Sequence, residues 1–115
     1  GTMLSTVLEA CNLLKEKNIF PSVINVHTIK PLDKKLCKLY IEKSKAIYTV
    51  EEHSIFGGLS TSIAELNSSL DKQTKHFSIA LPDDYSVSGE YDYLLDFYKL
   101  TPGAIAKTIL KNQNE

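Results

Sequence analysis

The sequence contains no arginine, so all 13 of its basic residues are lysines, and 14 acidic residues leave a net charge of −1. Arginine supplies the planar fork that binds phosphate and carboxylate groups through two parallel hydrogen bonds. A chain without that group and without an excess of positive charge lacks the surface with which proteins bind nucleic acids. We therefore expect no nucleic-acid partner.

Long apolar runs are also missing. No stretch approaches the roughly 20 apolar residues that span a bilayer, and no signal-peptide pattern opens the chain. The two cysteines, Cys11 and Cys37, stand far apart and outside any CxxC spacing, which favours free thiols over a disulfide. We expect no membrane partner, a cytoplasmic location and a single domain over residues 1–115.

The apolar residues that are present alternate between two periodicities. Helical spacing covers 3–17, the segment after Asp33, 59–70, 88–98 and 101–110, whereas β-branched or alternating runs cover 23–27, 46–50 and 76–81. Strands that alternate with helices pair in parallel through right-handed crossovers. The sequence therefore predicts an α/β fold, a three-layer α/β/α sandwich.

Local signals refine these elements. Asn18 can end the first helix in the left-handed region, and Asp33 can accept hydrogen bonds from the free amides of the second helix. The apolar stripes predict which side chains face the sheet. For the first helix they are Leu4, Val7, Leu8, Cys11 and Leu14, and for the second they are Leu36, Leu39, Tyr40 and Lys43.

The charged residues gather where the central strand, 46–50, turns into a helix. Two carboxylates and a histidine come first, then two glycines, then the first helical leucine: Glu51, Glu52, His53, Gly57, Gly58 and Leu59. Parallel strands end at the same edge of a sheet, where such folds bind ligands. His27, which ends the predicted strand 23–27, and Asp83, which follows the predicted strand 76–81, should therefore lie on the same rim.

Three kinds of site are compatible with this rim. A metal could be held by His27, His53 and Glu51 or Glu52, but no HExxH spacing occurs and we expect no metal there. An anion could bind the amides that follow Gly57 and Gly58, although no phosphate-loop motif is present. Glu51 or Glu52 could act with His53 in acid–base catalysis. The structural alternative is that one carboxylate caps the glycine turn.

The same residues carry a resemblance to a known family. The run from Val50 to His53, followed by Gly57-Gly58-Leu59 and Ala64-Glu65, resembles the signature of the C-terminal domain of transketolase-type thiamine diphosphate enzymes. The likeness extends upstream to 26–33 and downstream to 81–83, 88–89, 94–95 and 100–101. One position departs from the family, which usually has glycine where this chain has Ser60.

The resemblance implies a five-stranded, mixed and mostly parallel sheet. It implies that thiamine diphosphate and its magnesium ion lie between other domains, so no catalytic, cofactor-binding or metal-binding residue is transferred to this chain. Gly1-Thr2 would match the end of the family's first strand, which should then precede Gly1 in a longer chain. The expected partners are the remaining domains or subunit of the enzyme, in a homodimer or higher assembly.

Within the family, the Glu-Glu-His and Gly-Gly-Leu residues of the motif are more similar to those of transketolase than to those of 1-deoxyxylulose-5-phosphate synthase or the beta subunit of 2-oxo-acid dehydrogenases. A stand-alone protein-interaction module that uses the same rim is the alternative from another class. At the corner itself, we expect Gly57 or Gly58 to adopt a positive φ that swings the chain from strand into helix.

Overall fold

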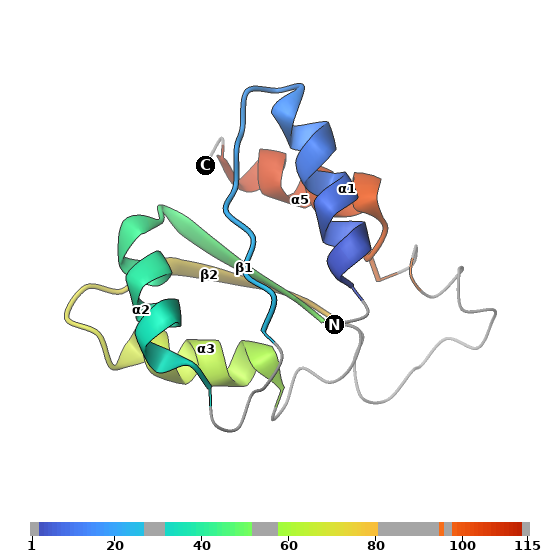
Figure 1. Ribbon diagram of the computed structural model, residues 1–115. Coiled ribbons are helices and arrows are strands. Elements are labelled where there is room, and N and C mark those ends of the chain that lie inside the picture. Colours follow the sequence, from blue (N-terminus) through green and yellow to red (C-terminus); the bar gives the residue numbers. More distant parts are fainter. Residues whose placement is uncertain (1–2, 27–31, 52–57, 81–94, 96–97, 114–115) are drawn as a thin grey trace.

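The computed structural model describes residues 3–26, 32–51, 58–80, 95 and 98–113. In chain order its elements are α1 (Leu4–Lys15), α2 (Lys34–Lys43), β1 (Ala46–Glu51), α3 (Leu59–Ser68), β2 (Lys75–Ala80) and α5 (Pro102–Gln113) (Figure 1). No helix of this described part is long and apolar enough to cross a membrane.

β1 and β2 form a parallel pair that is connected through α3. The register runs from Ala46 opposite Lys75 to Glu51 opposite Ala80. Tyr48 and Phe77 are direct neighbours in this register, and their rings stack with centroids 5.1 Å apart and planes 18° from parallel. β-branched and aromatic residues fit the pleated surface of a strand, which explains why these two segments form the sheet.

Helices cover both faces of this sheet (Figure 1). Tyr48 and Val50 pack with the cluster that joins α1 and α5, which includes Ala10, Ile79 and Ile105. Ile47 packs instead with the α2–α3 cluster of Cys37, Ile41 and Ile63. Because successive strand residues point to opposite faces, one strand supplies both cores. The predicted α/β fold with three layers is therefore confirmed.

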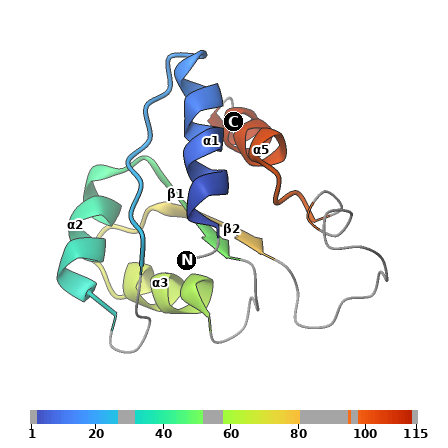
Figure 2. The ribbon, with the colours of Figure 1, turned by 45° about the vertical axis from the view of Figure 1, so that its right-hand side comes forward.

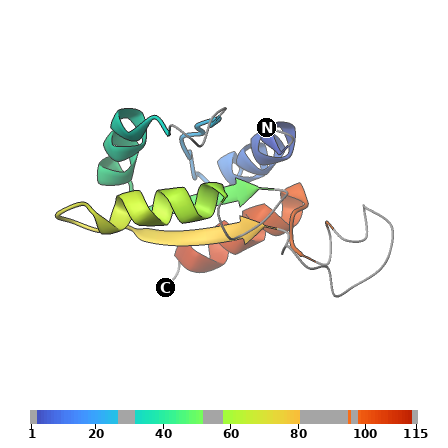
Figure 3. The ribbon, with the colours of Figure 1, turned by 90° about the horizontal axis from the view of Figure 1, so that it is seen from below.

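The predicted strand over 23–27 is wrong for the part that the structure describes, since residues 23–26 form no strand. The segment runs between α2 and α1, on the side of β1 opposite to β2 (Figure 3). Together with β1 it lines a cavity, and in the described part of the chain it does not join the ladder of β1 and β2. His27 and most of the predicted helix 88–98 lie outside the described residues.

Both helix-end signals are confirmed. Asn18 has φ 60° and follows α1, while the amides of Asn18 and Ile19 donate to the carbonyls of Lys15 and Leu14, the pattern of a Schellman motif. At the start of α2, Asp33 Oδ1 accepts from the amide of Leu36 at 3.1 Å. These signals are local, so they do not depend on how the helices pack.

The predicted inner faces are partly wrong. Leu36 and Leu39 of α2 are 39% and 50% exposed, whereas Cys37 and Ile41, four residues apart, face the core. On α1 the stripe holds for Cys11 and Leu14, but Leu8 is 47% exposed. The prediction that both segments are helices is therefore right, but the side of α2 that faces the core is not the predicted one. The sequence has apolar residues on two adjacent sides of α2, and the packing of the domain determines which side is buried.

A reciprocal hydrogen-bonded pair joins α3 to β2. The buried Asn67 side chain donates to the carbonyl of Thr74 at 2.7 Å and accepts from its amide at 3.0 Å. The Thr74 hydroxyl donates to the carbonyl of Ile41 at 3.0 Å, near the end of α2. One turn thus links α3, β2 and α2.

The two sides of α2 give a matched test of this packing. Ile41→Ala removes a fully packed side chain and should lower the free energy of unfolding by about 2–4 kcal/mol, whereas Leu39→Ala on the exposed side should change it by less than about 0.5 kcal/mol. Urea midpoints of the two variants measure the difference. Equal losses would show that α2 packs through its other face.

Candidate functional site

The carboxylate of Glu51 links the end of β1 to the start of α3. Glu51 Oε1 accepts a hydrogen bond from the amide of Leu59 at 3.0 Å, and Oε2 accepts from the amide of Ser60 at 2.8 Å. Both oxygens of the side chain are therefore used by the backbone of the helix that follows. The interaction spans eight and nine residues of sequence, so it ties the end of β1 directly to the start of α3.

The first amides of a helix have no partner inside the helix. Gly58, the N-cap of α3, has no side chain that could accept from them. Glu51 takes this role from the neighbouring strand, and its negative charge also lies at the positive end of the α3 dipole. The structural alternative considered for the rim, a carboxylate that caps the glycine turn, is confirmed for Glu51.

This arrangement bears on the other interpretations of the rim. A carboxylate that accepts two amide hydrogen bonds is poorly placed to take a proton from a substrate. The two amides that it occupies are also those an anion would need. Glu52, His53, Gly57, His27 and Asp83 lie outside the described residues, so their proposed meeting on the rim stays a prediction.

The glycine expectation can be assessed at one of its two positions. Gly58 has φ −97° and ψ −158°, which is extended backbone. Gly58 therefore does not have the positive φ, and the expectation for the pair stays a prediction because Gly57 lies outside the described residues. Ser60, where the family usually has glycine, is buried, and its amide is one of the two that Glu51 binds.

A second polar contact joins the two strands at a point that the sequence did not single out. Thr49, 4% exposed in β1, lies with its hydroxyl 3.0 Å from Nε2 of His76 in β2. Burial lowers the pKa of His76 from its usual 6.5, so the neutral ring is favoured. The sequence does contain a feature that indicates such a contact. Thr49 is a hydroxyl residue within an otherwise apolar run, and a hydroxyl that is buried needs a hydrogen-bond partner.

Both cysteine thiols are buried, which favours their protonated form. Burial raises the pKa of the Cys11 thiol, and burial together with nearby Asp33 raises that of Cys37. A protonated thiol is a weak nucleophile. Among the residues that the structure describes, no three His, Cys, Asp or Glu side chains come together as metal ligands.

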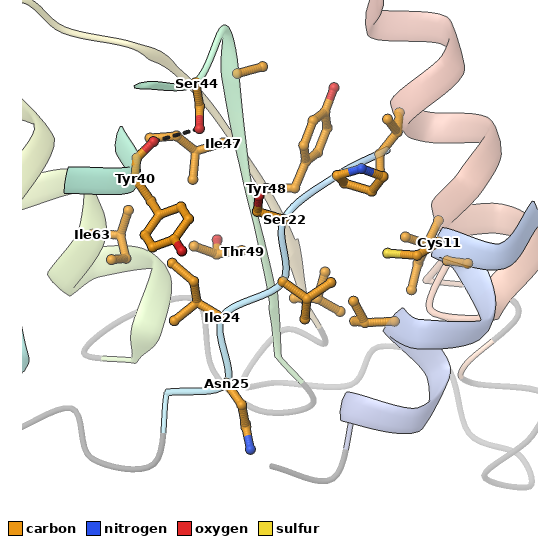
Figure 4. Close-up of a pocket in the computed structure, with 18 of the residues that line it drawn as sticks. Cys11, Ser22, Ile24, Asn25, Tyr40, Ser44, Ile47, Tyr48, Thr49 and Ile63 are labelled. Carbon is orange, nitrogen blue, oxygen red and sulfur yellow. Dashed lines mark hydrogen bonds between the residues drawn. The ribbon is translucent and has the colours of Figure 1, made fainter. Parts of the chain in front are cut away.

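A cavity lies between residues 18–26 and β1. It has a volume of about 780 Å³, and α1, α2, α3 and α5 complete its walls (Figure 4). Labelled side chains from each surrounding side, among them Cys11, Ile24, Tyr40 and Thr49, are drawn around it in Figure 4. Sequence reasoning missed this cavity because it depends on how far the segment stands from the strand.

Comparison with known proteins identifies the class to which this fold and corner belong. The family "Transketolase, C-terminal domain" matches residues 1–105, which is most of the chain. The chain therefore belongs to the transketolase C-terminal domain family, as the motif around Glu51 and Gly58 indicated.

Individual relatives point to two enzymes within that class. The chain is 39% identical over 110 residues to 1-deoxy-D-xylulose-5-phosphate synthase of Dictyoglomus turgidum, covering 96% of this chain and 18% of the relative. It is 36% identical over 116 residues to a putative transketolase C-terminal section of Methanocaldococcus jannaschii, covering 100% of this chain and 35% of the relative.

A solved structure gives the same answer for the fold. The structure titled "Split gene transketolase, inactive beta4 tetramer" matches with a TM-score of 0.85 and 28% identity, over 96% of this chain and 36% of that chain. The chain thus spans about a fifth to a third of the length of these proteins. The α/β fold that the sequence predicts is that of this family.

The role of Glu51 can be tested with a graded pair of variants. Glu51→Ala removes both acceptors and should lower the free energy of unfolding by about 1–2 kcal/mol, while Glu51→Gln keeps one acceptor and should lose less. Amides at the start of α3 should exchange faster in the same order. Glu65→Ala, an exposed change in the middle of α3, is the control and should match the wild type in both measurements.

His76 predicts how stability depends on pH. Because its pKa is lower in the folded than in the unfolded chain, the unfolded chain binds more protons between the folded pKa and 6.5. The contribution of His76 to the free energy of unfolding is therefore fully present above pH 6.5. It is lost as the pH falls from 6.5 toward the pKa of His76 in the folded chain. Urea midpoints should therefore fall less in His76→Gln than in the wild type between pH 7.5 and 5.5. Parallel curves would contradict this role.

Proposed function

We propose that this chain is the C-terminal domain of a thiamine diphosphate-dependent transferase of the transketolase type, and that it supports assembly rather than chemistry. The reaction would be transfer of two-carbon ketol units between sugar phosphates, carried out in other domains. The observation that carries this proposal is the Glu51 corner, where the residues of the family motif are used to join β1 to α3. The family membership and the solved structure of a split-gene transketolase support it.

The cofactor follows from the family and not from a site on this chain. Thiamine diphosphate supplies the carbanion chemistry of such enzymes when it is bound. The described residues offer a poor fit for its diphosphate and magnesium, because Glu51 occupies the leading amides of α3 and no metal-ligand group is assembled there. We therefore assign cofactor binding to the other domains of the complete enzyme.

The names of two similar proteins favour an enzyme whose C-terminal part can be a separate subunit. The relative from Methanocaldococcus jannaschii is named a C-terminal section, and the solved structure is titled a split-gene transketolase. We propose accordingly that the partners of this domain are the remaining transketolase domains, whether in the same chain or on a second subunit, within a dimer or higher assembly. A cytoplasmic location fits an enzyme of sugar-phosphate metabolism.

A second candidate rests on sequence identity. The 39% identity to 1-deoxy-D-xylulose-5-phosphate synthase is slightly higher than that to the transketolase section. Both enzymes would use this domain in the same supporting role, so the domain structure alone does not separate them. A stand-alone interaction module is disfavoured because the relatives are several times longer than this chain.

The complete protein, expressed together with any separate partner subunit, tests both candidates. We expect ketol transfer between two sugar phosphates, dependent on thiamine diphosphate and magnesium; synthesis of 1-deoxy-D-xylulose 5-phosphate by the same sample would favour the second candidate. Calorimetry on the 115-residue chain alone should show no micromolar binding of thiamine diphosphate. Such binding would overturn the proposed division of labour.

A further inference from the structure

A small hollow beside α5 is lined by three lysines. Lys107 and Lys111 belong to the helix, and Lys99 belongs to the turn before it. Ala104 and Thr108 complete the described part of the lining. The hollow has a volume of about 200 Å³, below the roughly 300–1,000 Å³ of pockets that enclose drug-sized ligands. Its size suits a small ion or one end of a larger ligand.

The sequence of α5 keeps this lining apart from the core. The residues that α5 contributes have the i, i+3, i+4, i+7 spacing of a single helical stripe: Ala104, Lys107, Thr108 and Lys111. Ile105 lies off that stripe and is 1% exposed, in the cluster where α5 packs beside α1 (Figure 2). Because Ala104 and Thr108 are small, they leave space beside the lysines.

Lys99 reaches the hollow from an unusual backbone position. Its φ is 63°, in the left-handed region that residues other than glycine adopt uncommonly. The next residue holds the turn in place: Leu100 is fully buried, and its amide donates to the carbonyl of Leu95 at 2.7 Å. Glycine would fit this backbone without strain, whereas lysine brings a positive charge to the hollow.

The positive charges of this region have no acidic neighbours in sequence. From Tyr98 to Gln113 the chain has three lysines and no aspartate or glutamate, although its net charge is −1 overall. No carboxylate belongs to the part of the lining that the structure describes. Lys111 lies in the last turn of α5, where the helix dipole favours a cation. That reason does not apply to Lys99 or Lys107, and like charges four residues apart destabilise a helix.

The chemistry of the lining favours a ligand with more than one negative charge. A lysine ammonium has three donors and no acceptor, and it binds phosphate as a point charge. The hydroxyl of Thr108 donates to the carbonyl of Ala104 at 2.9 Å, so its proton is not available to a ligand. Recognition therefore depends on the three ammonium groups, which attract a doubly charged phosphoryl group more strongly than a single carboxylate.

We propose that this hollow binds a phosphoryl group, either as inorganic phosphate or as part of a small phosphorylated metabolite. The described lining shares no residue with the cavity beside β1 or with the Glu51 corner. The proposal is therefore independent of the reaction that the complete protein performs.

The test is lysine footprinting of the complete protein, including any partner subunit. Sulfo-NHS acetate acetylates the lysines, and mass spectrometry gives the rate at each site with and without inorganic phosphate or glycerol 3-phosphate, at an ionic strength kept constant with sodium chloride. We expect slower acetylation of Lys99, Lys107 and Lys111. Lys34 and Lys38 of α2 are the matched control, because they are also exposed and four residues apart but line neither hollow, and their rates should not change.

Two double variants that remove the same charge separate local binding from general attraction. The protection of Lys99 is titrated with phosphate to give an apparent affinity. Lys107→Gln with Lys111→Gln should weaken it by roughly 2- to 30-fold, since two exposed charge contacts are lost. Lys34→Gln with Lys38→Gln should leave it unchanged.

Protection by inorganic phosphate that glycerol 3-phosphate does not exceed would assign the hollow to the free ion, and stronger protection by glycerol 3-phosphate would assign it to a phosphorylated metabolite. Absent protection, equal protection of the α2 lysines, or equal effects of the two double variants would overturn the proposal. Slow acetylation of Lys99, Lys107 and Lys111 relative to Lys34 before phosphate is added would also overturn it, because another part of the protein would then occupy these lysines. Enzymatic activity is measured separately, so a failure of the proposed function is distinguishable from a failure of this site.

Discussion

The bond pair between the Glu51 carboxylate and the amides of Leu59 and Ser60 is the constraint on which the rest of the domain depends. It fixes the start of α3 relative to the end of β1. From there α3 carries Asn67 to the position where both of its amide atoms bind the backbone of Thr74, just before β2. The hydroxyl of Thr74 in turn holds the end of α2 through Ile41. A continuous series of hydrogen bonds thus relates β1, α3, β2 and α2, while apolar packing supplies the cohesion between layers.

The same constraint gives a structural role to a residue whose type suggests an active site. A glycine followed by a helix start is an arrangement from which phosphate sites are built. Here the carboxylate is supplied from within the chain, so it satisfies the helix amides that an external anion would otherwise bind. Within the motif shared with the transketolase C-terminal family, Glu51 therefore joins the end of β1 to the start of α3.

Sequence reasoning succeeded where the determining interactions are local. The left-handed Asn18, the Asp33 cap and the strand over 46–50 depend on a few neighbouring residues, and the structure reproduces them. The position of the Glu51 cap was also foreseen as one alternative, although the choice between Glu51 and Glu52 was not. Reasoning failed where a distant partner decides. Leu36 and Leu39 have the periodicity of an inner face, but α3 and the sheet select Cys37 and Ile41 instead.

The failed strand over 23–26 shows where local preference alone does not decide the structure. β-Propensity expresses how well a residue fits a paired surface, so a β-branched segment forms a strand only where a neighbouring strand offers its edge. In the described part of the chain β1 pairs with β2, and residues 23–26 line the cavity on the other side of β1 without joining its ladder. Val23 is accordingly 38% exposed. Periodicity identifies a segment that could enter a sheet, whereas the packing of the whole domain decides whether it does.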